Sequence, residues 1–358
     1  MRKIGIISLF GYNNYGNRLQ LYAVQKMYES LGFDPEIIKY KQKIPADPLL
    51  IRMKVLVSYC LSFPANLKKN VLQKQRIQAF KNHSKIHYRE TKKYLDPLKI
   101  PTGFHENYSF FSVGSDQIWG WFTHPISDFV FLKFAPVEKR ITFSPSFGSS
   151  TIDQKYRGIF THGLREIKNI SVREESGAQI IKDFTNKDAT VLCDPTMCLS
   201  KKEWLTFATP HKIKPKGKFV LTYFLGELPL KVVAVLNIIT KDYEIVNLNS
   251  LKSPEFYAIS PSEWVDYINS ASLFLTDSFH GVVFSIVLQT PFVVYSRVGG
   301  ENMQTRITNI LEKFNMEDRF EMEYNDPSFF SGNFSLGSLI INNEKEKAIS
   351  FLKRSLNI

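Results

Sequence analysis

Residues 219–248 read FVLTYFLGELPLKVVAVLNIITKDYEIVNL, and this stretch decides the fold class of the chain. Its two ends, Phe219–Phe224 and Glu244–Leu248, are short apolar runs rich in β-branched and aromatic residues, which predicts buried strands. Between them, Leu228–Thr240 has the length and the apolar spacing of a helix. Strands that alternate with helices in this way are typical of a parallel sheet covered by helices.

The same alternation extends through the chain in two series. The first series has a helix at about Arg18–Leu31 and strands at Lys3–Leu9, Glu36–Tyr40, Ser109–Val113, Arg140–Ser144, Asn169–Val172 and Thr190–Leu192. The second adds helices at Pro261–Ser270 and Phe279–Gln289, and strands at Ser272–Thr276 and Phe292–Tyr295. Between the series, Ser200–Gly217 has no clear period and is rich in Lys, Thr, Pro and Gly, so we expect the domain boundary there.

The expected fold is therefore α/β, with two Rossmann-like, doubly wound domains. The N-terminal domain covers residues 1–200 and the C-terminal domain covers residues 201–335. A C-terminal helix is expected at residues 336–358. In such domains a ligand lies at the carboxyl ends of the strands, so functional side chains should directly follow strands.

Composition excludes several classes of protein. With 358 residues, 44% apolar and 22% charged, the chain is neither disordered, nor a rod, nor a small disulfide scaffold. The net charge of +12 comes from residues 39–99, which hold 15 Lys and Arg against three acids. Within this basic insert, residues 49–76 mix apolar and basic side chains, which indicates either docking on an anionic membrane or a solvated helix face.

The cysteines and the lengths of the apolar stretches predict where in the cell the protein works. Cys60, Cys193 and Cys198 are expected to be reduced thiols of a cytosolic protein, and their spacing predicts no metal site. No window reaches the roughly 18 apolar residues of a spanning helix. The N-terminus resembles a first strand rather than a signal peptide. We expect a cytoplasmic protein that is soluble or peripheral, without a cofactor.

Two polar clusters follow strands of the first series. Gly11–Asn17 contains glycine, tyrosine and three amides, which suits contact with a sugar or a phosphate. The alternative is a tight turn in which Asn17 caps the helix. The second cluster, Val113–Trp119, places Ser115 and Asp116 after a strand. Asp116 is either a carboxylate at a helix N-terminus or a general base.

Arg173 and Asp194 also follow predicted strands. The planar guanidinium of Arg173 suits a carboxylate or a phosphate, and the alternative is an ion pair with Glu174 or Glu175. Asp194, in Cys193–Thr196, is expected to shape a turn rather than to act in catalysis.

The most informative cluster is Leu275–Val282, LTDSFHGV. A strand delivers Thr-Asp-Ser, and His280-Gly281 then begins an apolar helix. The N-terminus of that helix offers free N–H groups to an anion. His280 in the first turn can donate a hydrogen bond to that anion or transfer a proton near neutral pH.

Taken together, these clusters resemble the polysaccharide pyruvyl transferase family. The resemblance runs from Ile4 to about Arg319 and depends on the order of the following motifs: Asn-Asn-Tyr-Gly with Leu19–Ala23, Val113–Trp119, Ser171–Glu174, Asp194–Thr196, Thr276–Gly281, and Asn302–Arg306. It implies a fold similar to GT-B glycosyltransferases, with the active site in the cleft between the domains. It also implies transfer of a pyruvyl group from phosphoenolpyruvate to a sugar, which forms a cyclic ketal and releases phosphate.

The resemblance implies that Arg173 and His280 bind phosphoenolpyruvate. We expect the start of the helix, Ser278, Phe279 and Gly281, to hold the phosphate, His280 to donate the proton, and Arg306 to add a second cation. The acceptor sugar is expected to meet Asp116 and the following residues: Asn13, Asn14, Tyr15, Gly16, Asn17 and Ser115.

Phosphoenolpyruvate is expected as co-substrate, and the acceptor as a polysaccharide or a lipid-linked oligosaccharide of exopolysaccharide or capsule assembly. Residues 49–76 are then expected to meet the inner face of the cell membrane. The main alternative is a GT-B glycosyltransferase with a nucleotide-sugar donor. A non-catalytic binding protein is a second alternative, but no nucleic-acid module is present, so nucleic acid is not an expected partner.

Overall fold

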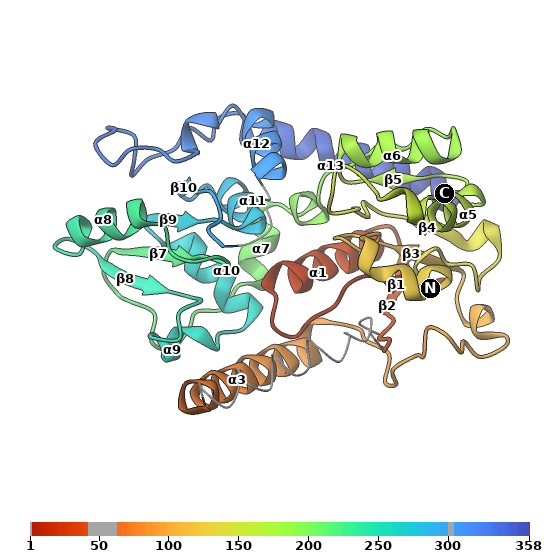
Figure 1. Cartoon of the computed structure of the whole chain (residues 1–358), viewed down its shortest axis with the longest axis horizontal. Helices are drawn as coiled ribbons and strands as arrows, with labels where there is room; N and C mark the ends of the chain where they lie inside the picture. Colours follow the sequence, from red (N-terminus) through yellow and green to blue (C-terminus); the bar gives the residue numbers. More distant parts are fainter. Residues whose placement is uncertain (1, 42–62, 300–303) are drawn as a thin grey trace. The chain divides into compact units, whose positions relative to one another are not determined.

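The computed structural model describes residues 2–41, 63–299 and 304–358 (Figure 1). Contacts divide the chain into two compact units, each of which is made of separate segments. Unit 1 consists of Met1–Phe63, Ser84–Cys198 and Glu344–Ile358. Unit 2 consists of Pro64–His83 and Leu199–Asn343. The chain therefore leaves unit 1 and returns to it twice.

This division differs from the expected domains of residues 1–200 and 201–335 in two places. Most of helix α3 (Phe63–His87), expected in the N-terminal domain, belongs to unit 2. There the buried guanidinium of Arg76 donates to the carbonyl oxygens of Tyr257 and Leu248. The end of helix α13 (Gly337–Leu356), expected to stand apart, belongs to unit 1.

Unit 1 is built on a parallel sheet in the order β2-β1-β3-β4. Its strands are β1 (Arg2–Ile7), β2 (Phe33–Ile37), β3 (Phe110–Val113) and β4 (Arg140–Thr142). Strand β1 is central, and Ile4, Ile6 and Ile7 have no exposed surface. Strands β2 and β3 lie on opposite sides of β1, so the chain connections run in opposite directions away from the point between β1 and β3. We call this point the switch point of unit 1.

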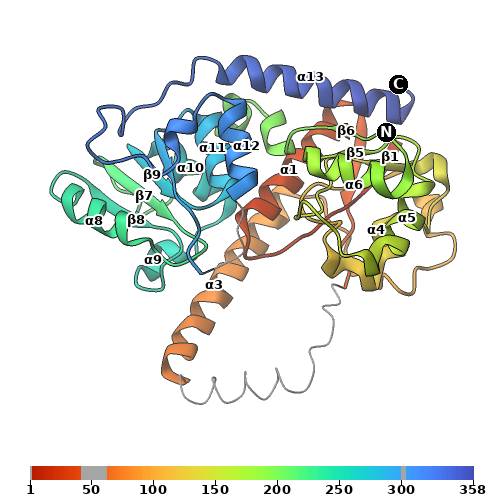
Figure 2. The same cartoon turned by 45° about the horizontal axis from the view of Figure 1, so that its top comes forward.

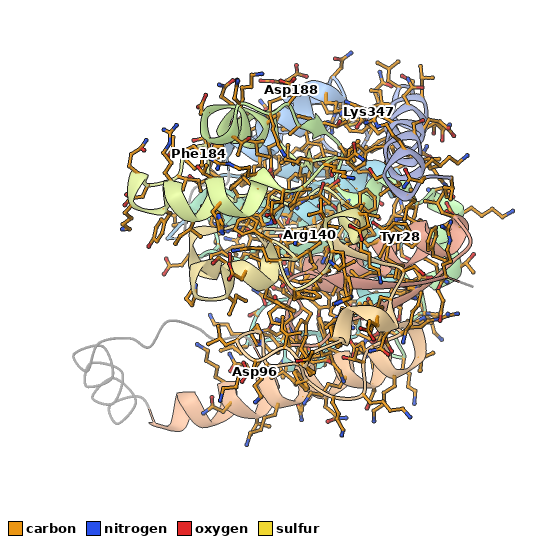
Figure 3. All side chains as sticks on the ribbon, turned by 90° about the vertical axis from the view of Figure 1, so that its right-hand side faces the viewer. Tyr28, Asp96, Arg140, Phe184, Asp188 and Lys347 are labelled. Carbon is orange, nitrogen blue, oxygen red and sulfur yellow. The ribbon has the colours of Figure 1, made fainter. Side chains whose placement is uncertain are left out.

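The other elements of unit 1 complete this α/β body. Strands β5 (Ser171–Val172) and β6 (Thr190–Val191) form a second parallel pair, and the Thr142 hydroxyl accepts from the Ser171 backbone N–H at 2.6 Å. Tyr28 donates to Ser112 Oγ at 2.7 Å, and Arg140 pairs with Glu166. Figure 3 labels Tyr28 and Arg140 among the side chains of this unit. The helices are α1 (Tyr15–Ser30), η1 (Phe104–Asn107), η2 (Trp121–Ile126), α4 (Ser127–Val130), η3 (Val137–Lys139), η4 (Gln154–Tyr156), α5 (Arg157–Arg165), α6 (Glu175–Thr185) and η5 (Pro195–Cys198).

Unit 2 repeats the same plan with the order β10-β9-β7-β8, again parallel throughout. Figure 2 labels β7, β8 and β9 of this sheet. The strands are β7 (Phe219–Tyr223), β8 (Glu244–Asn247), β9 (Leu273–Thr276) and β10 (Phe292–Val294). The helices are α7 (Lys201–Phe207), α8 (Leu230–Ile239), α9 (Pro254–Tyr257), α10 (Pro261–Ser270), α11 (Phe279–Leu288), α12 (Gln304–Lys313) and η6 (Glu317–Arg319).

Helices cover both faces of the unit 2 sheet. Leu273 and Leu275 of β9 pack in one apolar cluster with α8. The alternate residues, Phe274 and Thr276, lie against Gly281 of α11. Successive side chains of a strand point to opposite faces, so α8 and α11 cover opposite sides. The predicted α/β class, with two Rossmann-like and doubly wound units, is confirmed.

The basic insert is only partly described. Residues 42–62 lie outside the described residues, and helix α3 follows them. Arg76, expected on a membrane-facing surface, is instead buried in unit 2, while Lys69 and Lys74 are exposed. None of the helices in the described part of the chain is both long enough and apolar enough to cross a membrane.

Candidate functional site

The switch point of unit 1 brings together the loops that follow β1 and β3. Asn17, in the first turn of α1, donates its side-chain amide to Asp116 Oδ2. Asp116 also accepts from the Gln117 backbone N–H at 2.9 Å, and it has a φ of +60°. An amide and a carboxylate that are 99 positions apart therefore meet where this fold class binds ligands.

Two of the alternatives considered for these loops are wrong. The N-cap of α1 is Asn14, whose side chain accepts from the Asn17 backbone N–H at 3.2 Å, so Asn17 itself does not cap the helix. Nor does Asp116 begin a helix, because the next helical segment is η2, which starts at Trp121. The Asp116 carboxylate is held by side-chain and backbone donors instead of by a helix N-terminus.

The other expected acceptor residues differ in exposure. Asn13 and Asn14 are exposed at the rim of the loop. Tyr15 and Gly16 are buried in the first turn of α1, so the Tyr15 ring belongs to the core. Ser115 is also buried: its hydroxyl donates to the Ser144 carbonyl at 2.9 Å. Among the expected acceptor residues of this loop, Asn13 and Asn14 are thus exposed and Asn17 is half-buried.

Arg173 lies beside the same carboxylate and is itself only 7% exposed. Its Nε contacts Glu174 at 2.9 Å, its Nη1 contacts Asp194 at 2.8 Å, and Asp116 lies 3.9 Å from Nη1. The ion pair with Glu174, considered as an alternative, is thus present. Burial alone lowers the Arg173 pKa, but the carboxylates of Glu174, Asp194 and Asp116 outweigh it and raise that pKa above its ordinary value.

Asp194 has the structural role expected of it. Its Oδ1 accepts from the Thr196 backbone N–H at 3.0 Å and from the Thr196 hydroxyl at 2.7 Å, which shapes the turn into η5. Its Oδ2 holds Arg173. With one guanidinium and three carboxylates, the group of Asp116, Arg173, Glu174 and Asp194 is rich in hydrogen-bond acceptors.

The switch point of unit 2 lies between β7 and β9, and Asp277, which follows β9, connects the loops there. The Asp277 carboxylate accepts from the backbone N–H groups of Leu225 and Gly226 at 2.7 and 2.8 Å, in the loop after β7. It also pairs with Arg297 Nε at 3.2 Å, in the loop after β10. Asp277 therefore joins three strand ends. Asp277 lies in the predicted cluster LTDSFHGV, but the sequence pattern indicated no role for it. No pattern in the sequence pointed to Arg297.

The start of α11 is fixed by two hydroxyls. Ser278 is the N-cap and accepts from the Gly281 backbone N–H at 3.3 Å. The Thr276 hydroxyl accepts from the Ser278 N–H at 3.0 Å. A Cβ on Gly281 would lie 2.8 Å from that hydroxyl, so glycine allows the helix to approach β9 closely.

Three of the expected donor-binding residues lie together in unit 2. The rings of Phe279 and His280 are 5.3 Å apart at 84°, and both residues are half-buried. The Arg306 guanidinium lies 4.6 Å from the centre of the Phe279 ring. An aromatic face attracts a cation there, so Phe279 holds Arg306 near the first turn of α11. Arg173 belongs to unit 1, and a shared contact of Arg173 and His280 with one ligand stays a prediction.

Among the described residues, no group of three or more His, Cys, Asp and Glu side chains is arranged to hold a metal ion.

Comparison with solved structures finds distant likenesses. Spinosyn rhamnosyltransferase SpnG has a TM-score of 0.41 and 9% identity, with 100% of both chains covered. Anabaena HepE, solved with UDP and glucose, has a TM-score of 0.44 and 8% identity over 99% of this chain and 100% of HepE. S. aureus MnaA, solved with UDP, has a TM-score of 0.41 and 13% identity over 97% of each chain.

Comparison with curated proteins finds no match. The family model for polysaccharide pyruvyl transferase, in contrast, matches residues 14–297. That range begins at the N-cap of α1 and ends at Arg297, so it includes both switch points. The chain belongs to the polysaccharide pyruvyl transferase family.

Proposed function

We propose that this protein transfers the pyruvyl group of phosphoenolpyruvate to two hydroxyls of one sugar in a polysaccharide or a lipid-linked oligosaccharide. The product is a cyclic ketal, and inorganic phosphate is released. The observation that best supports this proposal is the grouping of His280, Phe279 and Arg306 at the start of α11, in a chain of this family.

Phosphoenolpyruvate carries a phosphate and a carboxylate, so its site needs cations and N–H donors. Arg306 supplies a guanidinium beside Phe279. Helix α11 is ten residues long, and its first turn supplies backbone N–H groups and the positive end of the helix dipole. His280 lies in that turn and can place a proton donor next to the bound anion.

The proposed reaction conserves atoms and protons. His280 protonates the methylene carbon of phosphoenolpyruvate, which becomes a methyl group, and the adjacent carbon acquires oxocarbenium character. One sugar hydroxyl attacks that carbon. The bond from that carbon to the phosphate oxygen then breaks, and the second hydroxyl closes the ring. Of the two hydroxyl protons, one replaces the proton that His280 gave, and the other leaves with phosphate.

We assign the acceptor to the unit 1 group around Asp116. Asn13 and Asn14 are exposed and can bond sugar hydroxyls, and Asp116 can take a hydroxyl proton. The amide of Asn17 holds the Asp116 carboxylate in place. In this scheme Asp116 is the general base, and Asn17 is a positioning residue.

Arg173 has a less direct assignment. Two of its nitrogens already contact Glu174 and Asp194 within 2.9 Å. We therefore propose that Arg173 mainly orders the carboxylates beside Asp116. The family resemblance implies a contact between Arg173 and phosphoenolpyruvate. For that contact, phosphoenolpyruvate would have to compete with Glu174 and Asp194 for the guanidinium.

Release of inorganic phosphate tests the proposal. Purified protein is incubated with phosphoenolpyruvate and a panel of lipid-linked oligosaccharides, and we expect phosphate release only when a suitable acceptor is present. A parallel thermal-shift experiment compares phosphoenolpyruvate with uridine and guanosine diphosphates. Phosphoenolpyruvate at about 100 times its Kd should stabilise the fold by about 2.7 kcal/mol. Stabilisation by the nucleotides alone would support a glycosyltransferase instead.

We also propose that the protein works at the inner, cytoplasmic face of the membrane, docking through residues 49–76. Lys69 and Lys74 are exposed on α3 and can face anionic lipid, whereas the buried Arg76 is excluded from this role. Sedimentation with anionic and neutral vesicles tests this proposal. We expect binding to anionic vesicles only, and equal binding to both kinds would reject it.

A further inference from the structure

Cys193 and Cys198 lie together in unit 1, at the two ends of the turn that contains Asp194. Their Sγ atoms are 3.6 Å apart, and both side chains are buried and unoxidised. The pair arises locally, because the 3₁₀ helix η5 brings Cys198 back toward the end of the segment that follows β6. The proposed transfer of the pyruvyl group uses neither thiol.

The two sulfurs are close enough to bond after a small movement. An S–S bond is about 2 Å long, so the sulfurs need to approach one another by about 1.5 Å. The six residues from Cys193 to Cys198 include Asp194, and a bond across their ends would change the shape of the turn. A covalent bond is far stiffer than the hydrogen bonds that shape this turn now.

This turn positions one side of the carboxylate group around Arg173. Asp194 Oδ2 lies 2.8 Å from Arg173 Nη1, and the same nitrogen lies 3.9 Å from Asp116. The turn is also fixed from outside, since the Ser144 hydroxyl donates to the Cys193 carbonyl at 2.8 Å. A displacement of about 1 Å is enough to disturb a catalytic arrangement.

We propose that Cys193 and Cys198 are a redox pair, which hydrogen peroxide converts to a disulfide that displaces Asp194 from Arg173. The thiolate of Cys193, the less buried of the two, attacks a peroxide oxygen, which yields a sulfenic acid and one water. The thiol of Cys198 then attacks the sulfenic sulfur, and a second water leaves. Two thiols lose two electrons and two protons, and one hydrogen peroxide becomes two waters.

The surroundings of Cys193 make this oxidation slow at neutral pH. The hydrogen bond with Cys198 raises the Cys193 pKa, and burial, Asp194 and Glu344 raise it further. The thiolate is the reactive form, so the rate should increase about tenfold for each pH unit between pH 7 and 9. The pair therefore resists brief exposure to oxidant and responds to sustained exposure.

The test uses the full chain in a Cys60→Ser background, which leaves only these two thiols. The protein is treated with hydrogen peroxide, quenched, denatured and alkylated. Both cysteines lie in the tryptic peptide of residues 188–201, so a disulfide lowers the mass of one peptide by about 2 Da and removes both alkylation sites. Dithiothreitol should restore both sites. A Cys198→Ala variant should form no such species, and its thermal unfolding reports whether it folds.

Two results would overturn the redox pair: both thiols remaining open to alkylation, or each oxidising separately to a sulfinic acid. The displacement of Asp194 is tested separately by hydrogen exchange of residues 171–176. We expect amide exchange there to become at least about threefold faster in the oxidised protein and to recover on reduction. Unchanged exchange would reject the displacement. Neither measurement depends on pyruvyl transfer, so failure of the proposed function would be seen separately.

Discussion

His280 combines two properties in one side chain. It lies in the first turn of α11, where backbone N–H groups attract an anion, and its imidazole can transfer a proton near neutral pH. Ser278 caps the helix and Gly281 packs against Thr276 without help from the imidazole. Loss of His280 should therefore remove the proposed chemistry and leave the fold in place.

Substitution His280→Ala tests this separation. We expect turnover of phosphoenolpyruvate to fall by about 10²–10⁴-fold, as for loss of a general acid, with the far-UV spectrum and the unfolding midpoint nearly unchanged. His162→Ala is the matched control, because His162 is exposed on α5. Near-normal turnover by the His280 variant would remove this residue from the mechanism.

Asp277 is a structural counterpart to His280 in the same segment. Its buried carboxylate accepts from two backbone N–H groups and pairs with Arg297. In Asp277→Asn, the new NH₂ group faces either a backbone donor or the guanidinium, and neither can accept a hydrogen bond. We expect a loss of about 3 kcal/mol or more in the free energy of unfolding, measured in urea.

Asp242→Asn serves as the control for that variant, because Asp242 is exposed and should change stability by less than about 0.5 kcal/mol. Equal stability of the two variants would mean that Asp277 does not hold the strand ends together.

The residues of the site were only partly predictable from the sequence. His280, Asp116 and Arg173 were found because they follow strands, and strand ends can be read from apolar runs. Their partners could not be found in this way. Asn17 meets Asp116 across 99 positions, and Asp277 meets Leu225 across 52. Such pairs depend on strand order, which local patterns do not encode.

Among the elements, the strands and the helices α1, α8, α10, α11 and α13 were predicted near their observed positions. Helix α10 has the predicted bounds, Pro261–Ser270, because Ser260 caps it and Pro261 begins it. The helices that were not predicted include α3, α5 and α7, and α7 lies in the segment that was interpreted as a domain boundary. It has a signal of its own: Ser200 and Glu203 form a capping box. Its seven residues are too few to show a helical period.

Removal of that cap gives a prediction for the element. In Ser200→Ala, the Glu203 backbone N–H loses the acceptor that it now has at 3.3 Å. We expect a local loss of about 1 kcal/mol, so hydrogen exchange of the α7 amides should be about fivefold faster. Thr206→Ala, at an exposed position of the same helix, is the control. No change in α7 exchange would show that packing of Trp204 and Phe207 alone holds the helix.

At the scale of the whole molecule, each unit is assembled from segments that are distant in the sequence. The change of composition at Ser200–Gly217 marks where the chain first enters the larger segment of unit 2, which begins at Leu199. The amino-acid composition of the chain does not indicate that residues 344–358 return to unit 1. Such a return depends on which apolar surface a helix covers, and an amphipathic helix does not specify its partner.

The returning helix gives the last prediction. Phe351, Leu352 and Leu356 of α13 are almost fully buried, and burial of each such side chain contributes about 1.5–3 kcal/mol. Truncation after Asn343 should therefore remove an amount comparable with the stability of a whole domain. We expect hydrogen exchange to show unit 1 amides losing protection while unit 2 amides keep theirs. Leu352→Ala should cost about 2–5 kcal/mol and its neighbour Lys353→Ala almost nothing. Full protection of unit 1 in the truncated chain would mean that α13 only lies on a body that is already complete.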